Sequence, residues 1–257
     1  MMDARYEVQR FPCCGNQIVN LGLRLLWHFL HLFVSLWYLG VGMVDGVESY
    51  LISCGILNRY KSFDVSKLNY LAIVMESEDA RRISKVIQLL QWLEAIGVKH
   101  LCLYDVEGIL KRSKESILQK LNNAVLYEDI EEKKDLQQDK KHITLEFTSI
   151  SDGKEAVAKA ANLLYSKYLE LAKTDKGQEV LMYTEAHLDD TLRAIGYRGP
   201  EPDLLLVYGP ARCHLGFPAW RMRYTEIVHM GPLKSMRYGS LAKAISKFTM
   251  VRQNYGK

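Results

Sequence analysis

The spacing of apolar and polar residues separates a long apolar stretch near the N-terminus from a region of short alternating elements. From Leu68 onward, apolar runs of strand length alternate with stretches whose apolar residues recur every three or four positions, the period of a helix. This pattern predicts strands at Leu68–Met75, Val98–Tyr104, Ile143–Thr148, Asp203–Tyr208 and Glu226–Met230. It predicts helices at Ala80–Ile96, Ser113–Asn123, Lys154–Lys173, Glu179–Ile195, Pro218–Tyr224 and Ser240–Gln253.

Alternation of strands and helices is typical of an α/β fold, in which helices flank both faces of a mostly parallel sheet. Two local signals sharpen the boundaries. Gly97 follows an amphipathic run and is expected to end that helix. Ser113 and Ser240 precede apolar runs and are expected to cap the helices that follow. We therefore expect a single α/β domain over residues 66–257.

The N-terminal apolar stretch reads LLWHFLHLFVSLWYLGVGMV and contains no Asp, Glu, Lys or Arg. Twenty helical residues span about 30 Å, the thickness of a bilayer's hydrocarbon core. Trp27, Trp37 and Tyr38 are residue types that favour membrane interfaces. The sequence therefore predicts a transmembrane or membrane-embedded helix at residues 25–44, after an N-terminal tail at residues 1–24 and before a juxtamembrane linker at residues 45–65.

Polar residues leave the arrangement of this segment open. Arg24, His28, His31 and Ser35 share one helical face, which suits either a partner helix or a helix lying in the membrane interface. Residues 43–58 are also fairly apolar and would suit the second arm of a membrane hairpin. The direction in which the chain crosses a membrane is therefore undecided.

Composition and motifs narrow the function classes. The net charge of +4 is small and the basic residues are scattered, so we expect no nucleic-acid partner. The five cysteines form no CxxC pair, which supports neither a disulfide framework nor a zinc site. The sequence contains no GxGxxG, GxxxxGK[ST], GxSxG or HExxH motif. We expect no metal ion bound directly by this chain.

An acidic turn follows the first predicted strand. Ligands of α/β proteins bind at the carboxyl ends of such strands, and a phosphate-binding turn usually offers glycines and free backbone N–H groups. Here the strand LAIVM is followed by Glu76, Ser77, Glu78 and Asp79. Negative side chains would repel phosphate, so a solvated turn is the simpler interpretation.

Three segments, in order, resemble the conserved regions of cis-prenyltransferases, enzymes that build long polyprenyl diphosphates from isopentenyl diphosphate. They read LAIVMESEDARR, GVKHLCLYDVEGILKRSKESI and PDLLLVYGPARCHLGFPAWRMRYTEIV. The resemblance runs from about Leu68 to the C-terminus and implies a cis-prenyltransferase-like central sheet.

The departures from the family pattern fall on its diphosphate-binding positions. Where family enzymes carry Asp-Gly-Asn-Gly-Arg, with the Asp holding magnesium, this chain carries Glu76, Ser77, Glu78, Asp79 and Ala80. The Arg and Ser that hold the second diphosphate fall at Cys213 and Leu215. The resemblance therefore implies a degenerate active site with no catalytic residue of its own.

A degenerate site joined to a membrane segment is similar to one branch of the family. That branch comprises the Nogo-B-receptor-like accessory subunits of eukaryotic cis-prenyltransferase complexes, which lie at the endoplasmic reticulum membrane. The resemblance implies a subunit that anchors, stabilises and activates a catalytic cis-prenyltransferase making dehydrodolichyl diphosphate for dolichol synthesis and protein glycosylation. Such a subunit is required by the transferase complex without being catalytic alone, and its folded domain is expected in the cytosol. Magnesium is expected in the partner's site.

The same resemblance suggests which residues meet the partner. Accessory subunits lend a C-terminal Arg-x-Gly tail to isoprenyl diphosphate in the partner's site. This chain ends VRQNYGK, with Asn254 at the Arg position, and its expected diphosphate contacts are Asn254, Tyr255, Gly256 and Lys257. The expected dimer interface comprises Phe217, Trp220, Tyr224 and Glu226. Membrane lipid is the other expected partner.

Three alternatives remain open at the level of sequence. One is an accessory subunit for very-long-chain, rubber-type polyisoprene. Another is an active homodimeric cis-prenyltransferase that uses Glu76. The last is a membrane-anchored scaffold that binds an unrelated ligand.

Overall fold

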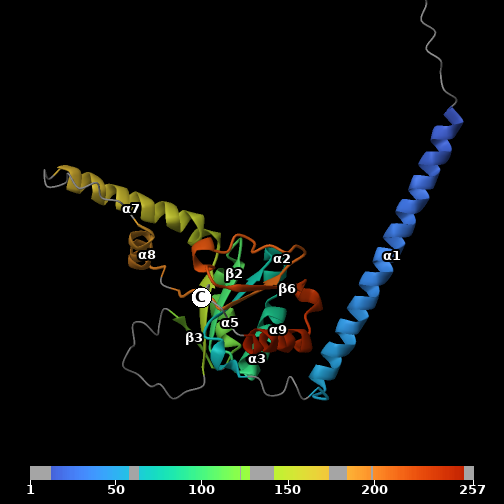
Figure 1. Cartoon of the computed structure of the whole chain (residues 1–257). Coiled ribbons are helices and arrows are strands. Elements are labelled where there is room, and N and C mark those ends of the chain that lie inside the picture. Colours follow the sequence, from blue (N-terminus) through green and yellow to red (C-terminus); the bar gives the residue numbers. More distant parts are fainter. Residues whose placement is uncertain are drawn as a thin grey trace, which may run out of the picture. The chain divides into compact units, whose positions relative to one another are not determined.

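The computed structural model describes residues 13–57, 64–121, 123–127, 142–173, 184–197 and 199–251. These residues belong to two compact units, Met1–Tyr50 and Leu51–Lys257. Most of the first unit is a single helix, and the second contains the sheet (Figure 1). Each unit is described by itself.

The helix α1 runs without interruption from Cys13 to Ser53. It therefore includes the predicted membrane segment, residues 25–44, and continues to residue 53. The prediction that residues 43–58 form a separate hairpin arm is wrong for residues 43–53, which belong to the same helix. No proline interrupts the sequence between Cys13 and Ser53, and the backbone can keep its helical hydrogen bonds throughout. Its segment Val19–Ser53 is long and apolar enough, by length and composition alone, to cross a membrane.

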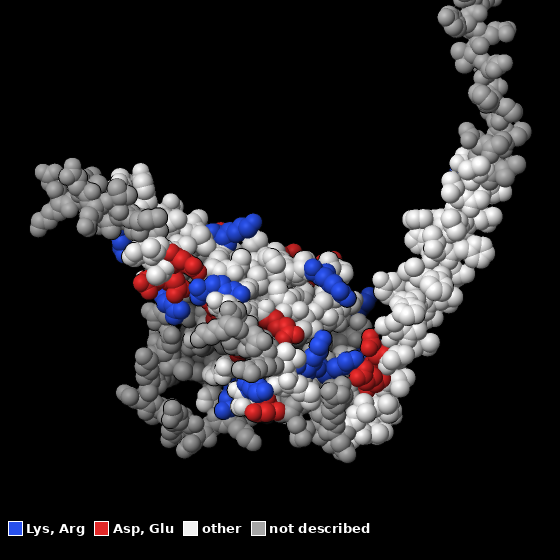
Figure 2. Space-filling view, viewed as in Figure 1, with Lys and Arg blue, Asp and Glu red and all other residues white. Residues whose placement is uncertain are grey.

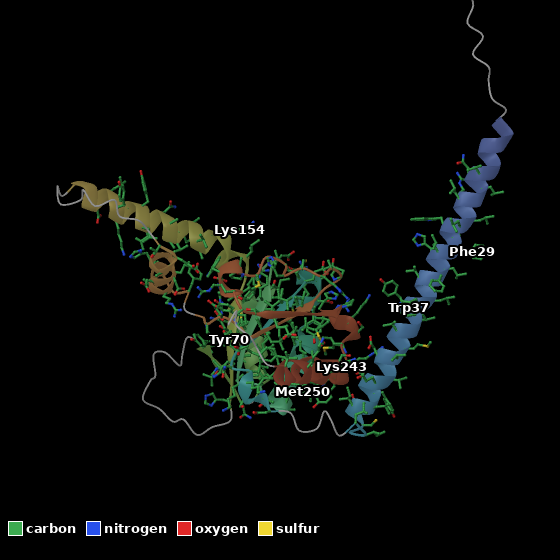
Figure 3. All side chains as sticks on the ribbon, in the orientation of Figure 1. Phe29, Trp37, Tyr70, Lys154, Lys243 and Met250 are labelled. Carbon is green, nitrogen blue, oxygen red and sulfur yellow. The ribbon has the colours of Figure 1, made fainter. Side chains whose placement is uncertain are left out.

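The described side chains of α1 are largely uncharged (Figure 2). Large apolar groups point outward around it, among them Phe29, which is 68% exposed, and Trp37, which is 66% exposed (Figure 3). Such a continuous apolar surface is unfavourable in water and favourable in lipid.

The second unit is built on a six-stranded sheet with the order β3-β4-β2-β1-β5-β6, in which every neighbouring pair is parallel. The parallel α/β architecture predicted from the sequence is therefore confirmed. The strands are β1 (Leu71–Met75), β2 (His100–Asp105), β3 (Ala124–Leu126), β4 (Ile143–Thr148), β5 (Leu204–Tyr208) and β6 (Glu226–Gly231). The short edge strand β3 was not expected, because the sequence pattern ended a helix at Asn123.

The helices of this unit are α2 (Ser77–Ala80), α3 (Ile83–Ile96), α4 (Ile109–Arg112), α5 (Lys114–Gln119), α7 (Lys154–Lys173), α8 (Glu185–Ala194) and α9 (Tyr238–Met250). Short 3-10 turns lie at η2 (Val65–Lys67), η3 (Ile150–Asp152), η4 (Ala219–Arg221) and η5 (Leu233–Ser235). Helix α3 ends at Gly97, as predicted, because this residue adopts φ +98° and its N–H closes the last turn onto Leu93 and Glu94.

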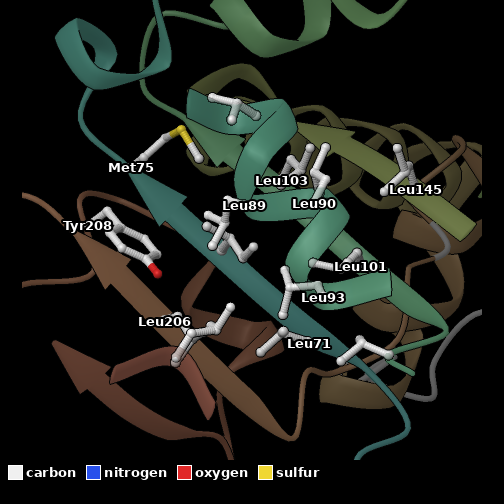
Figure 4. Close-up of a cluster of buried hydrophobic side chains, with 14 of the residues drawn as sticks. Leu71, Met75, Leu89, Leu90, Leu93, Leu101, Leu103, Leu145, Leu206 and Tyr208 are labelled. Carbon is white, nitrogen blue, oxygen red and sulfur yellow. The ribbon is translucent and has the colours of Figure 1, made fainter. Parts of the chain in front are cut away.

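Strand β1 is the centre of the core, and all five of its side chains are fully buried. Successive side chains of a strand point to opposite faces of the sheet. Leu71 and Met75 enter a cluster with Leu89 and Leu90 of α3 (Figure 4). Ala72 on the other face joins a second cluster, which includes Cys102, Tyr104, Leu205 and Phe217. A strand covered on both faces explains the uninterrupted apolar run LAIVM.

Three local predictions are corrected by the structure. The helix expected at Pro218–Tyr224 is only the 3-10 turn η4, in which the Arg221 side chain is buried and pairs with Glu146. Helix α9 begins at Tyr238, two residues before the expected cap Ser240; the Tyr238 ring packs edge-on against Trp92. Ser113 lies at the junction of α4 and α5 and makes no side-chain capping bond.

The buried Arg221 forms an ion pair with the partly buried Glu146 of β4. The guanidinium Nη1 and Nη2 atoms lie 3.0 and 2.7 Å from Glu146 Oε1 and Oε2. Arg221 Nη2 also donates to Pro200 O at 2.9 Å, and Tyr70 OH donates to the same carboxylate. A Cβ at Gly199 would approach both charged groups closely, so a larger residue there would require the Arg221 and Glu146 side chains to shift. The pair thus ties the segment after β5 to the opposite half of the sheet.

Replacing Arg221 should therefore destabilise the fold strongly. Arg221→Met leaves the largely enclosed Glu146 carboxylate without its cation, which costs up to about 3–5 kcal/mol of unfolding free energy. Urea unfolding of the detergent-solubilised chain, followed by circular dichroism, measures this loss. The matched change Arg81→Met breaks the exposed pair with Glu107 and should cost no more than about 1 kcal/mol. Equal losses in the two variants would contradict the assignment.

Candidate functional site

The candidate site lies where the three central strands end. Met75 of β1 is in register with Asp105 of β2 and Tyr208 of β5, so their carboxyl ends meet at one edge of the sheet. Open parallel sheets bind ligands at this edge. The acidic turn therefore follows the central strand at the position where a ligand would be expected.

Neighbouring strands hold the backbone of this turn. The Glu76 N–H donates to Tyr208 O at 3.1 Å, which joins the turn to β5. The Ser77 hydroxyl accepts a bond from the Glu107 N–H at 3.2 Å, which joins it to the loop after β2. The turn then coils into α2, so its backbone is packed against its neighbours rather than opened into a glycine-rich cradle.

The three carboxylates of the turn lie in different environments. Asp79 is buried, and its Oδ2 accepts a bond from the Leu233 N–H at 3.0 Å, which ties the turn to η5. Arg82 Nε lies 3.9 Å from Asp79 Oδ1. Glu76 is half-buried, whereas Glu78 is exposed. Among the described residues, no group of three or more His, Cys, Asp or Glu side chains could hold a metal ion.

Asp105, at the end of β2, has a structural role that the sequence analysis missed. Its fully buried carboxylate accepts bonds from the Ile109 N–H at 2.8 Å and the Leu110 N–H at 2.9 Å. Aspartate is a favoured acceptor for the free N–H groups at the start of a helix. The signal was an Asp a few residues before the apolar Ile109–Leu110 pair.

The loop after β5 places an apolar residue at the second diphosphate position. Leu215 adopts φ +50° and packs partly buried against the cluster that contains Tyr104 and Phe217. Tyr104 OH donates to Leu215 O at 3.1 Å and fixes this conformation. Burial, with the nearby Asp105 and Asp152 carboxylates, raises the pKa of Tyr104 to about 12, so it remains a hydrogen-bond donor at neutral pH. The other position, Cys213, is exposed.

The residues expected at a dimer interface lie in different environments. Phe217 is 1% exposed and packs edge-on against Tyr104, with ring centroids 5.5 Å apart, so its side chain supports the core instead of forming a surface. Trp220 is half-buried against the α7–α8 cluster. Tyr224 is 62% exposed, and Glu226 is half-buried on the edge strand β6. Residues 254–257, the expected diphosphate contacts, lie outside the described part of the chain.

Asp203, one of the residues that carry the family resemblance, has a structural role in this chain. Its Oδ2 accepts bonds from the Asn69 N–H at 2.7 Å and the Tyr70 N–H at 3.0 Å. Its backbone N–H donates to Tyr70 O, and its carbonyl accepts from the Glu226 N–H. Asp203 thus aligns the starts of β1, β5 and β6.

The two acidic neighbours of the turn should differ sharply in their effect on stability. Asp79→Ala leaves the buried Leu233 N–H without an acceptor and should cost about 1–3 kcal/mol of unfolding free energy. The matched change Glu78→Ala removes an exposed carboxylate and should change stability by no more than about 0.5 kcal/mol. Urea unfolding of both variants tests the structural role, and an unchanged Asp79→Ala midpoint would refute it.

Comparison with known proteins relates this geometry to a family. The chain is 26% identical over 198 residues to the human dehydrodolichyl diphosphate synthase complex subunit NUS1, a match that covers 72% of this chain and 65% of that protein. It is 25% identical over 202 residues to the Saccharomyces cerevisiae subunit of the same name, covering 66% of this chain and 52% of that one. The matched region thus spans less than two thirds of either relative. No protein-family model matches the chain.

A solved structure confirms the fold. The crystal structure of lavandulyl diphosphate synthase from Lavandula x intermedia, in complex with dimethylallyl diphosphate, superposes with a TM-score of 0.52. At 15% identity, the match covers 76% of this chain and all of that one. The sheet is therefore cis-prenyltransferase-like. The names of the curated relatives bear out the resemblance to a dehydrodolichyl diphosphate synthase complex subunit.

Proposed function

We propose that this chain is a non-catalytic accessory subunit of a dehydrodolichyl diphosphate synthase complex. The observation that carries the proposal is a cis-prenyltransferase-like sheet whose ligand-binding edge carries side chains unsuited to diphosphate. The Asp79 carboxylate accepts a hydrogen bond from the backbone N–H of Leu233 in η5. In the loop after β5, the apolar Leu215 side chain packs partly buried against the core. Catalysis of diphosphate chemistry depends on cations and N–H groups placed around the phosphates. The relatives' names support the same assignment.

In this proposal the catalytic partner supplies the chemistry and holds magnesium. The accessory chain contributes Tyr224 and Glu226 to the contact between subunits. Trp220, which packs partly buried against the α7–α8 cluster, supports that surface. Its tail, Asn254–Lys257, reaches isoprenyl diphosphate in the partner's site. Asn254 donates hydrogen bonds to phosphate oxygens, and Lys257 adds positive charge. The complex makes dehydrodolichyl diphosphate for dolichol synthesis and protein glycosylation.

Co-expression with a catalytic cis-prenyltransferase tests the assignment directly. We expect the two chains to co-purify and to elongate farnesyl diphosphate with isopentenyl diphosphate and magnesium, whereas the accessory chain alone forms no product. Elongation by the purified chain alone would overturn the proposal in favour of an active homodimer. Failure to retain any cis-prenyltransferase would favour a scaffold with another ligand. The chain length of the product separates dehydrodolichyl from rubber-type synthesis.

The tail should affect turnover without affecting assembly. Deleting residues 254–257 removes phosphate contacts made in the partner's site, and we expect the kcat/KM of the complex for isopentenyl diphosphate to fall about tenfold or more. Pull-down of the partner should be unchanged. Asn254→Arg restores a charged, bidentate phosphate donor and should raise kcat/KM above that of the natural chain. Full activity of the deleted form would refute the role of the tail.

We further propose that α1 anchors the complex in the endoplasmic reticulum membrane, with the folded domain in the cytosol. The apolar stretch at residues 25–44 and the outward-facing Phe29 and Trp37 support this placement.

The membrane role predicts a specific fractionation result. The full chain should remain in the membrane pellet after carbonate extraction. The double variant Phe29→Arg/Phe33→Arg places two charges in the apolar stretch, at about 2.5–3.5 kcal/mol each, and should move much of the chain to the supernatant. Tyr165→Arg/Tyr168→Arg, the same change on another exposed helix, serves as the control and should stay in the pellet. Retention of both variants would contradict anchoring by α1.

A further inference from the structure

The last turn of α9 is closed by a side chain from the other end of the domain. The final four carbonyl groups of a helix have no N–H partner within the helix and need donors from elsewhere. Thr249 O is one of these groups, and Lys67 Nζ donates to it at 2.9 Å. Met250 ends the helix (Figure 3), and Val251 then leaves the helical conformation with φ −81° and ψ 137°. Lys67 therefore holds α9 at the point where the chain continues toward its C-terminus.

The turn that carries Lys67 is itself fixed by the core. Lys67 is the last residue of η2, which packs against α9. The Leu68 N–H donates to Val65 O at 2.9 Å and closes this turn. Leu68 belongs to the same buried cluster as Phe248 of α9, and Val65 packs against that cluster. The backbone around Lys67 is thus held in place, and its ammonium group meets α9 from a fixed position.

The contact suits a cation. Carbonyl groups at the C-terminal end of a helix carry partial negative charge, and an ammonium donor makes a stronger bond to them than a neutral one. Thr249 is 4% exposed, so water has little access to its side of the bond. Lys67 precedes Thr249 by 182 positions, and the bond therefore joins the beginning of the folded domain to its end.

We propose that Lys67 is a positioning residue for the C-terminal tail, because it fixes the end of α9 from which the tail departs. This role rests on the proposed function, in which residues 254–257 reach isoprenyl diphosphate in the partner's site. A segment that starts from a fixed helix end has fewer conformations to lose when it binds, and its contacts then contribute more to the transition state. Lys67 acts through the tail and does not touch the substrate.

A double-mutant cycle on the complex with its catalytic partner tests this role. Lys67→Met keeps the aliphatic stem and removes the donor, and we expect the kcat/KM of the complex for isopentenyl diphosphate to fall about fivefold. In a chain that lacks residues 254–257, the same change should lower kcat/KM by less than about 1.5-fold, because no tail remains to be positioned. General destabilisation of the domain would lower kcat/KM alike in both backgrounds.

Two further variants serve as controls. Lys67→Arg keeps a charged donor and should retain at least about half of the kcat/KM. Lys247→Met removes the same charge from an exposed position in the last turn of α9, and it should change kcat/KM less than about twofold. Pull-down of the catalytic partner should be the same for all these chains.

Hydrogen exchange of the full chain in detergent measures the contact without the partner. In Lys67→Met, we expect the backbone N–H groups of residues 247–251 to exchange about fivefold faster, while those of α3 stay unchanged. Unchanged exchange at the end of α9 would overturn the role of Lys67, whether or not a complex forms.

The activity measurements separate this role from the accessory function. Equal losses from Lys67→Met in the tailed and tailless complexes would overturn positioning of the tail and leave the accessory function standing. If deletion of the tail has no effect, the role of the tail and that of Lys67 fail together, although the complex persists. If no complex with a cis-prenyltransferase forms, the accessory function itself is refuted, and the positioning role with it.

Discussion

Burial of β1 on both faces is the constraint on which the rest of the second unit depends. Its five apolar side chains are removed from water only if one layer covers Leu71 and Met75 and another covers Ala72 and Val74. The flanking strands β2 and β5 form the backbone hydrogen bonds of β1. Helices α3 and α9 supply the layer that covers Leu71 and Met75. The second layer is closed by Phe217, and the Arg221–Glu146 pair holds the adjoining segment in place.

The same constraint brings the acidic turn to the edge at which open parallel sheets bind ligands. In this chain, the residues there bond to or pack against other parts of the domain. Asp79 accepts a bond from η5, Ser77 accepts one from the loop after β2, and Leu215 packs toward the core. A domain can keep its fold when the residues at its ligand-binding edge make internal hydrogen bonds and apolar contacts instead of binding a ligand. In the proposed accessory role, the catalytic residues are then supplied by the partner subunit.

Prediction from sequence succeeded where one strong local signal dominated. Strand β4 and helix α7 have the boundaries that the periodicity predicted, and Gly97 ends α3 as expected. It failed where a distant partner decided the conformation. The turn at Ala219–Arg221 is short, and its Arg221 pairs with Glu146, 75 residues earlier in the chain. Helix α4 begins at Ile109 because Asp105 caps it from the end of a strand. The strand periodicity does not predict that bond, although an Asp a few residues before Ile109 is compatible with it.

By itself, the sequence determined the α/β class, the apolar N-terminal helix, and the acidic character of the turn at Glu76–Asp79. These features depend on periodicity, length and residue type, which are local properties. Only the tertiary structure decided that Asp79 is buried and accepts a bond from the Leu233 N–H, that Phe217 belongs to the core, and that Arg221 pairs with Glu146. Each of these depends on which groups meet across long separations in the chain, because burial and hydrogen-bond partners are set by packing and not by the neighbours in sequence.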